Sequence, residues 1–100
     1  MSFEKRLQSG EFVVLAEMNT PKGVDISRFM TDARRIKGRV DAAVIPDMDN
    51  GVMRMSALAG GVLAQQQGLE TIIHVYGRDR NRMALQGDLL AAHVLGIQNL

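Results

Sequence analysis

The chain contains three short runs of apolar residues that are nearly continuous rather than alternating. They are FVVLA (residues 12–16), DAAVI (41–45) and TIIHVY (71–76). A strand with one face in water alternates apolar and polar residues, whereas a strand buried on both faces is apolar throughout. The runs therefore predict three strands of a parallel sheet, because sheets of that kind are covered on both faces.

Between the strands, apolar residues recur at the three- and four-residue spacing of an amphipathic helix. The apolar positions with this spacing lie within residues 26–36, 55–63 and 83–94. Asp25 and Asn81 are placed to cap the first and third helices at their N-termini. Gly38, Gly68 and Gly96 stand where the three helices are expected to stop.

The order of strand and helix repeats three times, with the unit length of about thirty residues that is typical of a βα unit. Residues 97–100 (IQNL) have the character of a fourth strand, and residues 3–8 are expected to form a short helix under the first strand. Right-handed crossovers place the helices outside a parallel sheet. The repeat therefore predicts an α/β fold.

Two architectures contain such repeats, the doubly wound open sheet and the TIM (βα)8 barrel. The first βα turn lacks a G-x-G-x-x-G fingerprint, which disfavours the dinucleotide-binding open sheet. A complete barrel needs about 250 residues, and a sheet cut within a strand leaves an unpaired edge. We expect residues 1–100 to be the N-terminal portion of a single barrel domain. The portion would be its first three to four βα units, with strand four beginning near residue 97 and cut at 100.

Charge and composition exclude several classes of protein. The 12 basic and 11 acidic residues leave a net charge of +1, without the basic excess that nucleic-acid binding usually requires. The chain has no cysteine, which excludes disulfides and thiolate metal sites and favours a reducing cytoplasm. No apolar run approaches the ~20 residues that span a membrane, and the N-terminal residues lack a signal-peptide core. A cytoplasmic protein without nucleic-acid or membrane partners is expected.

A polar cluster follows each predicted strand. The clusters are EMNTPKGVD, PDMDNGVMR and GRDRN. Parallel sheets of both architectures carry their chemistry at the carboxyl ends of the strands, so we expect these three clusters to build the functional site.

Glu17 is the candidate acid in the first cluster, because it follows five apolar residues at the end of a strand. Partial desolvation of its carboxyl would raise its pKa and suit it to general acid catalysis. Two structural alternatives remain open. Glu17 could be a solvated residue at the strand exit, or a partner for Lys22.

In the second cluster, Asp47 and its neighbours do not meet the spacing of a calcium loop, so no metal is expected. These side chains are expected to shape the loop or to cap the next helix. Residues 51–56 are predicted to start that helix, where Arg54 could bind a phosphate or could be an ordinary solvated arginine.

The third cluster places Asp79 between two arginines, Arg78 and Arg80. Asp79 could form an ion pair that fixes the loop, or either arginine could meet a phosphate or carboxylate. His74 lies within the strand, where a core role and a cofactor contact are both open. With two histidines and no cysteine, a zinc site is not expected.

Three longer segments resemble one known family. AEMNTPKGVD, MRMSALA and RDRNRMALQGDLLAAHVLGIQNL are together similar to the start of the methylenetetrahydrofolate reductase family, over about residues 12–100. The resemblance implies a flavin-containing (βα)8 barrel of one-carbon metabolism. In this family a hydride passes from a nicotinamide cofactor through FAD to methylenetetrahydrofolate, which yields methyltetrahydrofolate.

The resemblance also implies roles for single residues. Glu17 falls on the family's glutamate at the end of strand one, the proposed general acid for opening the five-membered ring of the folate. His74 falls on a histidine near the flavin in some members. Asp47 follows a proline where many members have threonine, and Tyr76 replaces a more usual threonine. The implied catalytic residue is Glu17, and the implied cofactor-binding residues are His74, Tyr76, Asp47 and Arg78.

Three alternatives to this function remain open. The barrel could take electrons from a reduced electron-carrier protein instead of NADH. It could bind a folate or pterin and transfer a methyl group without flavin. The chain could also be a non-catalytic half-barrel whose fourth-strand edge pairs with another copy. A folate substrate and a homo-oligomer are expected, and the hundred residues alone are expected to be inactive, because later strands carry much of the flavin site.

Overall fold

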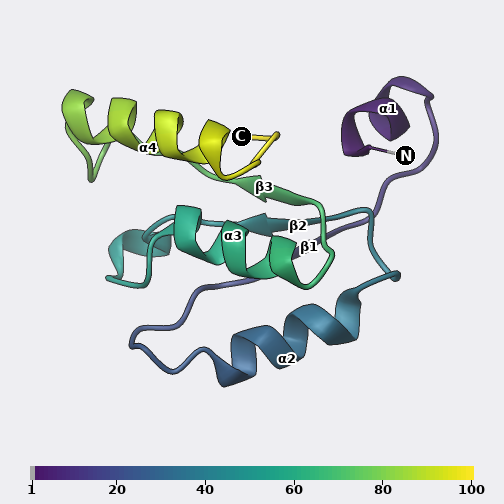
Figure 1. Cartoon of the computed structure of the whole chain (residues 1–100), viewed down its shortest axis with the longest axis horizontal. Helices are drawn as coiled ribbons and strands as arrows, with labels where there is room; N and C mark the ends of the chain where they lie inside the picture. Colours follow the sequence, from purple (N-terminus) through teal and green to yellow (C-terminus); the bar gives the residue numbers. More distant parts are fainter. Residues whose placement is uncertain (1) are drawn as a thin grey trace.

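The computed structural model describes residues 2–100 as a sheet with helices alternating between its strands (Figure 1). The elements in chain order are α1 (Phe3–Gln8), β1 (Leu15–Glu17), α2 (Ser27–Ile36), β2 (Ala42–Ile45), the 3-10 helix η1 (Asp49–Gly51), α3 (Ala57–Gln66), β3 (Thr71–Ile73) and α4 (Arg82–Val94). The predicted alternation of strand and helix is therefore confirmed.

The three strands form one parallel sheet in the order β1-β2-β3. The register places Glu17 beside Val44 and Val44 beside Ile72. Beyond β3, Asn99 forms a parallel bridge with Ile72, and its carbonyl accepts from the amide N–H of Ile73 at 3.1 Å. The segment in which the sequence predicts a fourth strand therefore contributes one isolated bridge beside β3.

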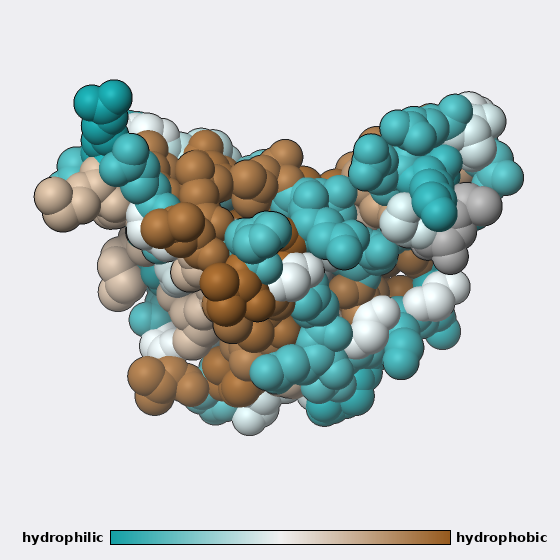
Figure 2. All heavy atoms as spheres, turned by 45° about the horizontal axis from the view of Figure 1, so that its top comes forward, coloured by the Kyte–Doolittle hydropathy of each residue, from teal (hydrophilic) through white to brown (hydrophobic). Residues whose placement is uncertain are grey.

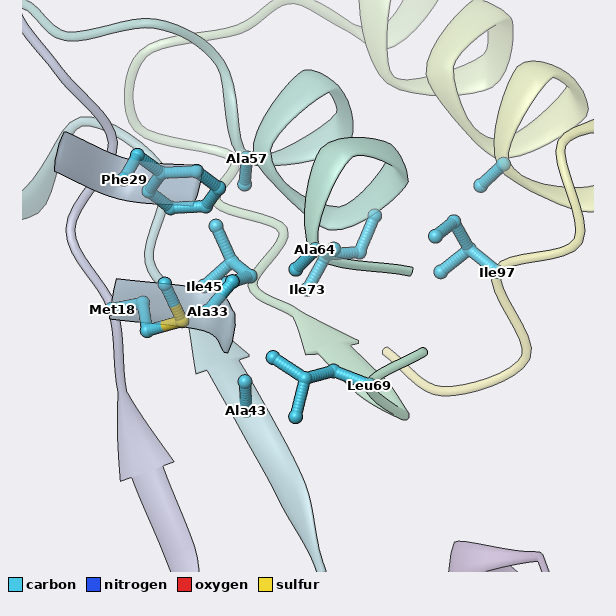
Figure 3. Close-up of a cluster of buried hydrophobic side chains, with 11 residues drawn as sticks. Met18, Phe29, Ala33, Ala43, Ile45, Ala57, Ala64, Leu69, Ile73 and Ile97 are labelled. Atoms are coloured by element: carbon cyan, nitrogen blue, oxygen red, sulfur yellow. The ribbon is translucent and has the colours of Figure 1, made fainter. Parts of the chain in front are cut away.

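The helices α2, α3 and α4 pack against the same face of the sheet. The core that all three helices share contains the strand side chains Ala43, Ile45 and Ile73 (Figure 3). These residues alternate along the strands with Val44 and Ile72, whose side chains point to the opposite face. The helices contribute Phe29, Ala33, Ala57, Ala64 and Ala92 to that core. A doubly wound sheet would carry helices on both faces. The fold is thus a parallel α/β fold that is consistent with part of a βα barrel.

The contact between α3 and the sheet depends on two adjacent glycines. A Cβ on Gly60 would lie 2.5 Å from Thr20 Cγ2 and 2.9 Å from Ile45 Cγ2, and a Cβ on Gly61 would lie 2.6 Å from Ile73 Cγ2. Real Cβ atoms do not approach other carbons so closely, so the backbone of α3 lies directly on side chains of the sheet.

Each of α2, α3 and α4 is followed by a glycine with positive φ. The φ angles are +81° at Gly38, +90° at Gly68 and +82° at Gly96. This left-handed conformation costs glycine little and ends the helix, as the sequence predicts.

The two predicted N-caps differ in outcome. The Asn81 side chain accepts a hydrogen bond from the amide N–H of Ala84 at 2.8 Å, so the predicted cap of α4 is confirmed. The prediction for α2 is wrong by one residue, because the N-cap is Ile26. The Asp25 carboxylate instead accepts from the amide N–H of Ser27 at 3.0 Å, two residues along the chain.

The first strand begins later than predicted, at Leu15 rather than at residue 12. Phe12 is 88% exposed, and the amide N–H of Val14 donates to the side chain of Asp41 at 2.8 Å instead of to a neighbouring strand. The third strand is also shorter than predicted, although the amide N–H of His74 still donates to the carbonyl of Ile45 at 3.0 Å.

The helix α1 has the predicted bounds and lies at the amino end of the sheet. Arg6 Nε lies 2.6 Å from Asp41 Oδ1, and Asp41 immediately precedes β2. The same carboxylate holds the chain just before β1, so one aspartate connects α1 to both neighbouring strands. No helix within residues 2–100 is long and apolar enough to cross a lipid bilayer.

Candidate functional site

Glu17 lies on the face of the sheet opposite the helices, at the carboxyl end of β1. Its neighbour Met18 is buried in the core, and successive strand side chains point to opposite faces. Glu17 is exposed, and within residues 2–100 its carboxylate makes no ion pair or hydrogen bond, either with Lys22 or with another residue. The expected desolvation is therefore absent in this chain alone, because nothing in it covers the open face at this point.

A cavity of 570 Å³ lies alongside the end of β1. Its walls are residues 16–21, one side of α2 and Arg54. Charged side chains of both signs contribute, including Arg28 and Asp32 of the helix. The cavity is open to solvent and lies beside β1, which is an edge strand of the three-strand sheet.

Asp47 follows β2 and is 2% exposed. Its two carboxylate oxygens lie 2.8 Å and 3.0 Å from Arg80 Nε and Nη2, and Oδ1 also accepts from the amide N–H of Ala57 at 3.1 Å. The hydrogen bonds from Arg80 hold the pKa of Asp47 below its ordinary value against the opposing effect of burial. Asp47 therefore caps α3, as predicted, and α3 starts at Ala57 instead of within residues 51–56.

Arg80 joins three parts of the fold. Besides its contacts with Asp47, its Nη1 lies 2.8 Å from Oδ2 of Asp88 on α4. The sequence pattern does not predict the pairing of Arg80 with Asp47, although both residues follow adjacent parallel strands and so lie near one another. Arg80 therefore has a structural role, because its guanidinium is occupied by two carboxylates. Arg78 is the more accessible of the two arginines.

His74, Tyr76 and Arg78 form a contiguous group at the end of β3. His74 Nδ1 lies 3.0 Å from Tyr76 Oη, and the guanidinium carbon of Arg78 lies 5.9 Å from the centre of the Tyr76 ring. Arg78 pairs with Asp79 at 2.6 Å and donates to the carbonyl of Met48 at 3.1 Å. The contact between Arg78 and Asp79 confirms the prediction that Asp79 forms an ion pair within its loop, and the Arg78 guanidinium lowers the pKa of Asp79.

The first and second clusters are also connected. Arg54 Nη1 donates to the carbonyl of Thr20 at 2.9 Å, and the buried Thr20 hydroxyl donates to the carbonyl of Met55. The loop between β2 and α3 also contains two residues in the left-handed conformation, Met48 and Asn50, with φ angles of 49° and 58°. Arg54 thus holds two loops together, and it lies neither at a helix start nor free in solvent.

The structure therefore brings three of the four implied cofactor-binding residues into contact, namely His74, Tyr76 and Arg78. Asp47 is adjacent to them through the Met48 carbonyl, but its carboxylate is occupied by Arg80. Glu17 shares their end of the sheet without a direct contact to the group. Within residues 2–100 no group of three or more His, Cys, Asp or Glu side chains could hold a metal ion.

A parallel sheet with its helices on one face and polar side chains at its carboxyl end defines an α/β protein with a site at that end. The family model described as methylenetetrahydrofolate reductase matches residues 2–100. The chain belongs to the methylenetetrahydrofolate reductase family, an oxidoreductase family, and the resemblance seen in its sequence is confirmed. Comparisons with curated proteins and with solved structures give no match.

Proposed function

We propose that the chain supplies the first three βα units, and the start of the fourth strand, of a (βα)8 barrel. The helices cover one face of the sheet, and the opposite face is the one that would become the interior of a barrel. Leu15, on that face, is 47% exposed, as expected for a side chain whose neighbours in a barrel are still missing. The bridge at Asn99 supports continuation of the sheet beyond β3.

We infer that this barrel catalyses the flavin-dependent reduction of 5,10-methylenetetrahydrofolate to 5-methyltetrahydrofolate. The observation that carries this inference is the family match over residues 2–100. The side chains at the carboxyl end suit FAD, because they combine apolar surface at Val44 and Ile72 with polar groups at His74 and Arg78. When bound, FAD supplies the hydride chemistry between the nicotinamide donor and the folate.

In this proposal Glu17 is the catalytic acid. It donates a proton to a ring nitrogen of the folate as the bond from that nitrogen to the methylene carbon breaks. The remaining nitrogen then forms an iminium that can accept a hydride. An exposed carboxylate is a weak acid catalyst at neutral pH, so the further strands and the substrate have to desolvate Glu17 before it can act.

The test is the absorption spectrum of the protein, purified in its longest natural form with FAD. Addition of NADH should bleach the flavin bands, and subsequent addition of methylenetetrahydrofolate should restore them. A protein that retains no flavin after free FAD has been removed would refute the flavoenzyme proposal. Bleaching by a reduced carrier protein, and not by NADH, would instead identify a protein partner as the electron donor.

The variant Glu17→Gln tests the role of the acid separately. It should leave the bleaching by NADH intact and slow the recovery by about 100-fold or more, the typical contribution of a general acid. Glu70→Gln is the matched control, because Glu70 immediately precedes β3 and lies at the amino end of the sheet. If both variants recover at the wild-type rate, Glu17 is not the proton donor.

A homo-oligomer remains part of the proposal. Met83, Leu90 and Val94 form an exposed apolar stripe on α4, and Figure 2 shows apolar surface in a band on the side of the molecule away from α1. Apolar surface of this kind is typical of contact sites. Sedimentation of the purified protein would measure its oligomeric state directly.

A further inference from the structure

The side chains of His74 and Tyr76 share a hydrogen bond at the carboxyl end of the sheet. The distance from Nδ1 to Oη is 3.0 Å, and the ring centres are 5.7 Å apart at an angle of 60°. A phenol is a good proton donor, and an unprotonated imidazole nitrogen is a good acceptor. The favoured direction is therefore from the Tyr76 hydroxyl to His74 Nδ1, which leaves the proton of the neutral imidazole on Nε2.

Tyr76 is itself held in place. The guanidinium of Arg78 lies over its ring, and Arg78 is fixed by Asp79 and by the carbonyl of Met48. The position of the Tyr76 hydroxyl is thus fixed, and the contacts extend from the loop after β2 to His74, which immediately follows β3. No protein partner for His74 Nε2 is found within residues 2–100.

We propose that Tyr76 is a positioning residue that fixes the tautomer and the ring orientation of His74. With Nδ1 occupied, the Nε2–H is the one free donor of the ring, available to a carbonyl oxygen or an unprotonated ring nitrogen of a bound ligand. The identity of that ligand as a flavin or a folate rests on the proposed function, whereas the tautomer does not. A ligand with an acceptor at this point would be preferred over an analogue that presents a donor.

Nitrogen NMR of the protein labelled with ¹⁵N-histidine tests the tautomer without any ligand. The chain has two histidines, and His93 is exposed on α4, so it serves as an internal reference and His93→Gln assigns the signals. Above neutral pH, the wild-type spectrum should show His74 with an unprotonated Nδ1 and a protonated Nε2. A protonated Nδ1 in the wild type would overturn the proposal without recourse to a variant.

In Tyr76→Phe the two nitrogen shifts of His74 should move toward each other as both tautomers become populated, while those of His93 stay in place. Unchanged His74 shifts in a folded Tyr76→Phe protein would overturn the positioning role. The same variant should weaken FAD binding by about tenfold in the longest natural form, the equivalent of one hydrogen bond. Failure of the wild type to bind FAD would refute the proposed function and leave the tautomer result standing.

Discussion

Replacement of Gly60 by alanine tests how closely α3 packs on the sheet. The new methyl group would lie 2.5 Å from Thr20 Cγ2 and 2.9 Å from Ile45 Cγ2. Thr20 is 1% exposed and Ile45 is fully buried, so neither side chain can swing into solvent to make room. The helix or the strand has to move instead.

The expected change in stability combines two opposing effects. Alanine in place of glycine within a helix stabilises it by about 1 kcal/mol. Overpacking of a filled core costs about 1–3 kcal/mol, and two contacts under 3 Å with buried side chains favour the upper end. We expect Gly60→Ala to lower the free energy of unfolding by about 2 kcal/mol, a large part of the stability of a small domain.

Urea unfolding followed by circular dichroism measures this effect, with Gly87→Ala as the matched control. Gly87 is also inside a helix, but a Cβ placed there meets nothing within 4 Å. Gly87→Ala should therefore raise the stability by up to about 1 kcal/mol. If Gly60→Ala stabilises the protein as much as Gly87→Ala does, the close packing of α3 on the sheet is refuted.

Two further predictions concern the charged and capping residues. Because the folded pKa of Asp47 is lowered, its ion pair with Arg80 stabilises the protein above the ordinary pKa of 3.8, and this stabilisation is lost as pH falls through the lower folded value. Asp47→Asn should cost about 3 kcal/mol at pH 7 and should flatten the acid limb of stability against pH, as measured by thermal unfolding; an unchanged acid limb would contradict the pairing. Asn81→Ala should cost about 1 kcal/mol through loss of the α4 cap, whereas Asn81→Asp should retain most of the stability, and equal losses in the two would argue against capping.

The periodicity of the sequence predicted the elements better than it predicted their bounds. Glycines placed after each apolar stripe gave correct helix ends, because a positive φ at those positions is a local property of the chain. The start of β1 was wrong because the apolar segment before Leu15 has no strand beside it, and Phe12 lies in solvent. An apolar run shows that a residue can be buried, but the neighbouring strands decide where pairing starts.

The start of α3 was missed for a related reason. Residues 51–56 were expected to start the helix. Instead, the Asp47 carboxylate accepts from the amide N–H of Ala57, and Arg54 and Met55 are hydrogen-bonded to Thr20. These contacts join residues far apart in sequence and override local propensity.

The candidate site was predicted in its location more reliably than in its contacts. The topology of parallel strands puts Asp47 and Arg78 at one end of the sheet, as the sequence analysis expected. The topology does not show that Asp47 binds Arg80, since it does not distinguish between the two arginines on either side of Asp79. The exposure of Glu17 was also outside the reach of the pattern, because its desolvation requires partners on the open face.

Because of the positive-φ glycines after α2, α3 and α4, the two ends of the sheet differ in the substitutions that they tolerate. At the amino end, each return to the sheet depends on one backbone conformation at Gly38, Gly68 or Gly96, so insertions or side chains there would shift a whole strand. At the carboxyl end, positive φ angles are confined to the loop after β2, at Met48, Asn50 and Gly51. Side chains such as Arg54 and Arg80 hold the loops at this end in place. Substitutions in the carboxyl-end loops that keep these side-chain contacts are therefore expected to leave the register of the strands unchanged.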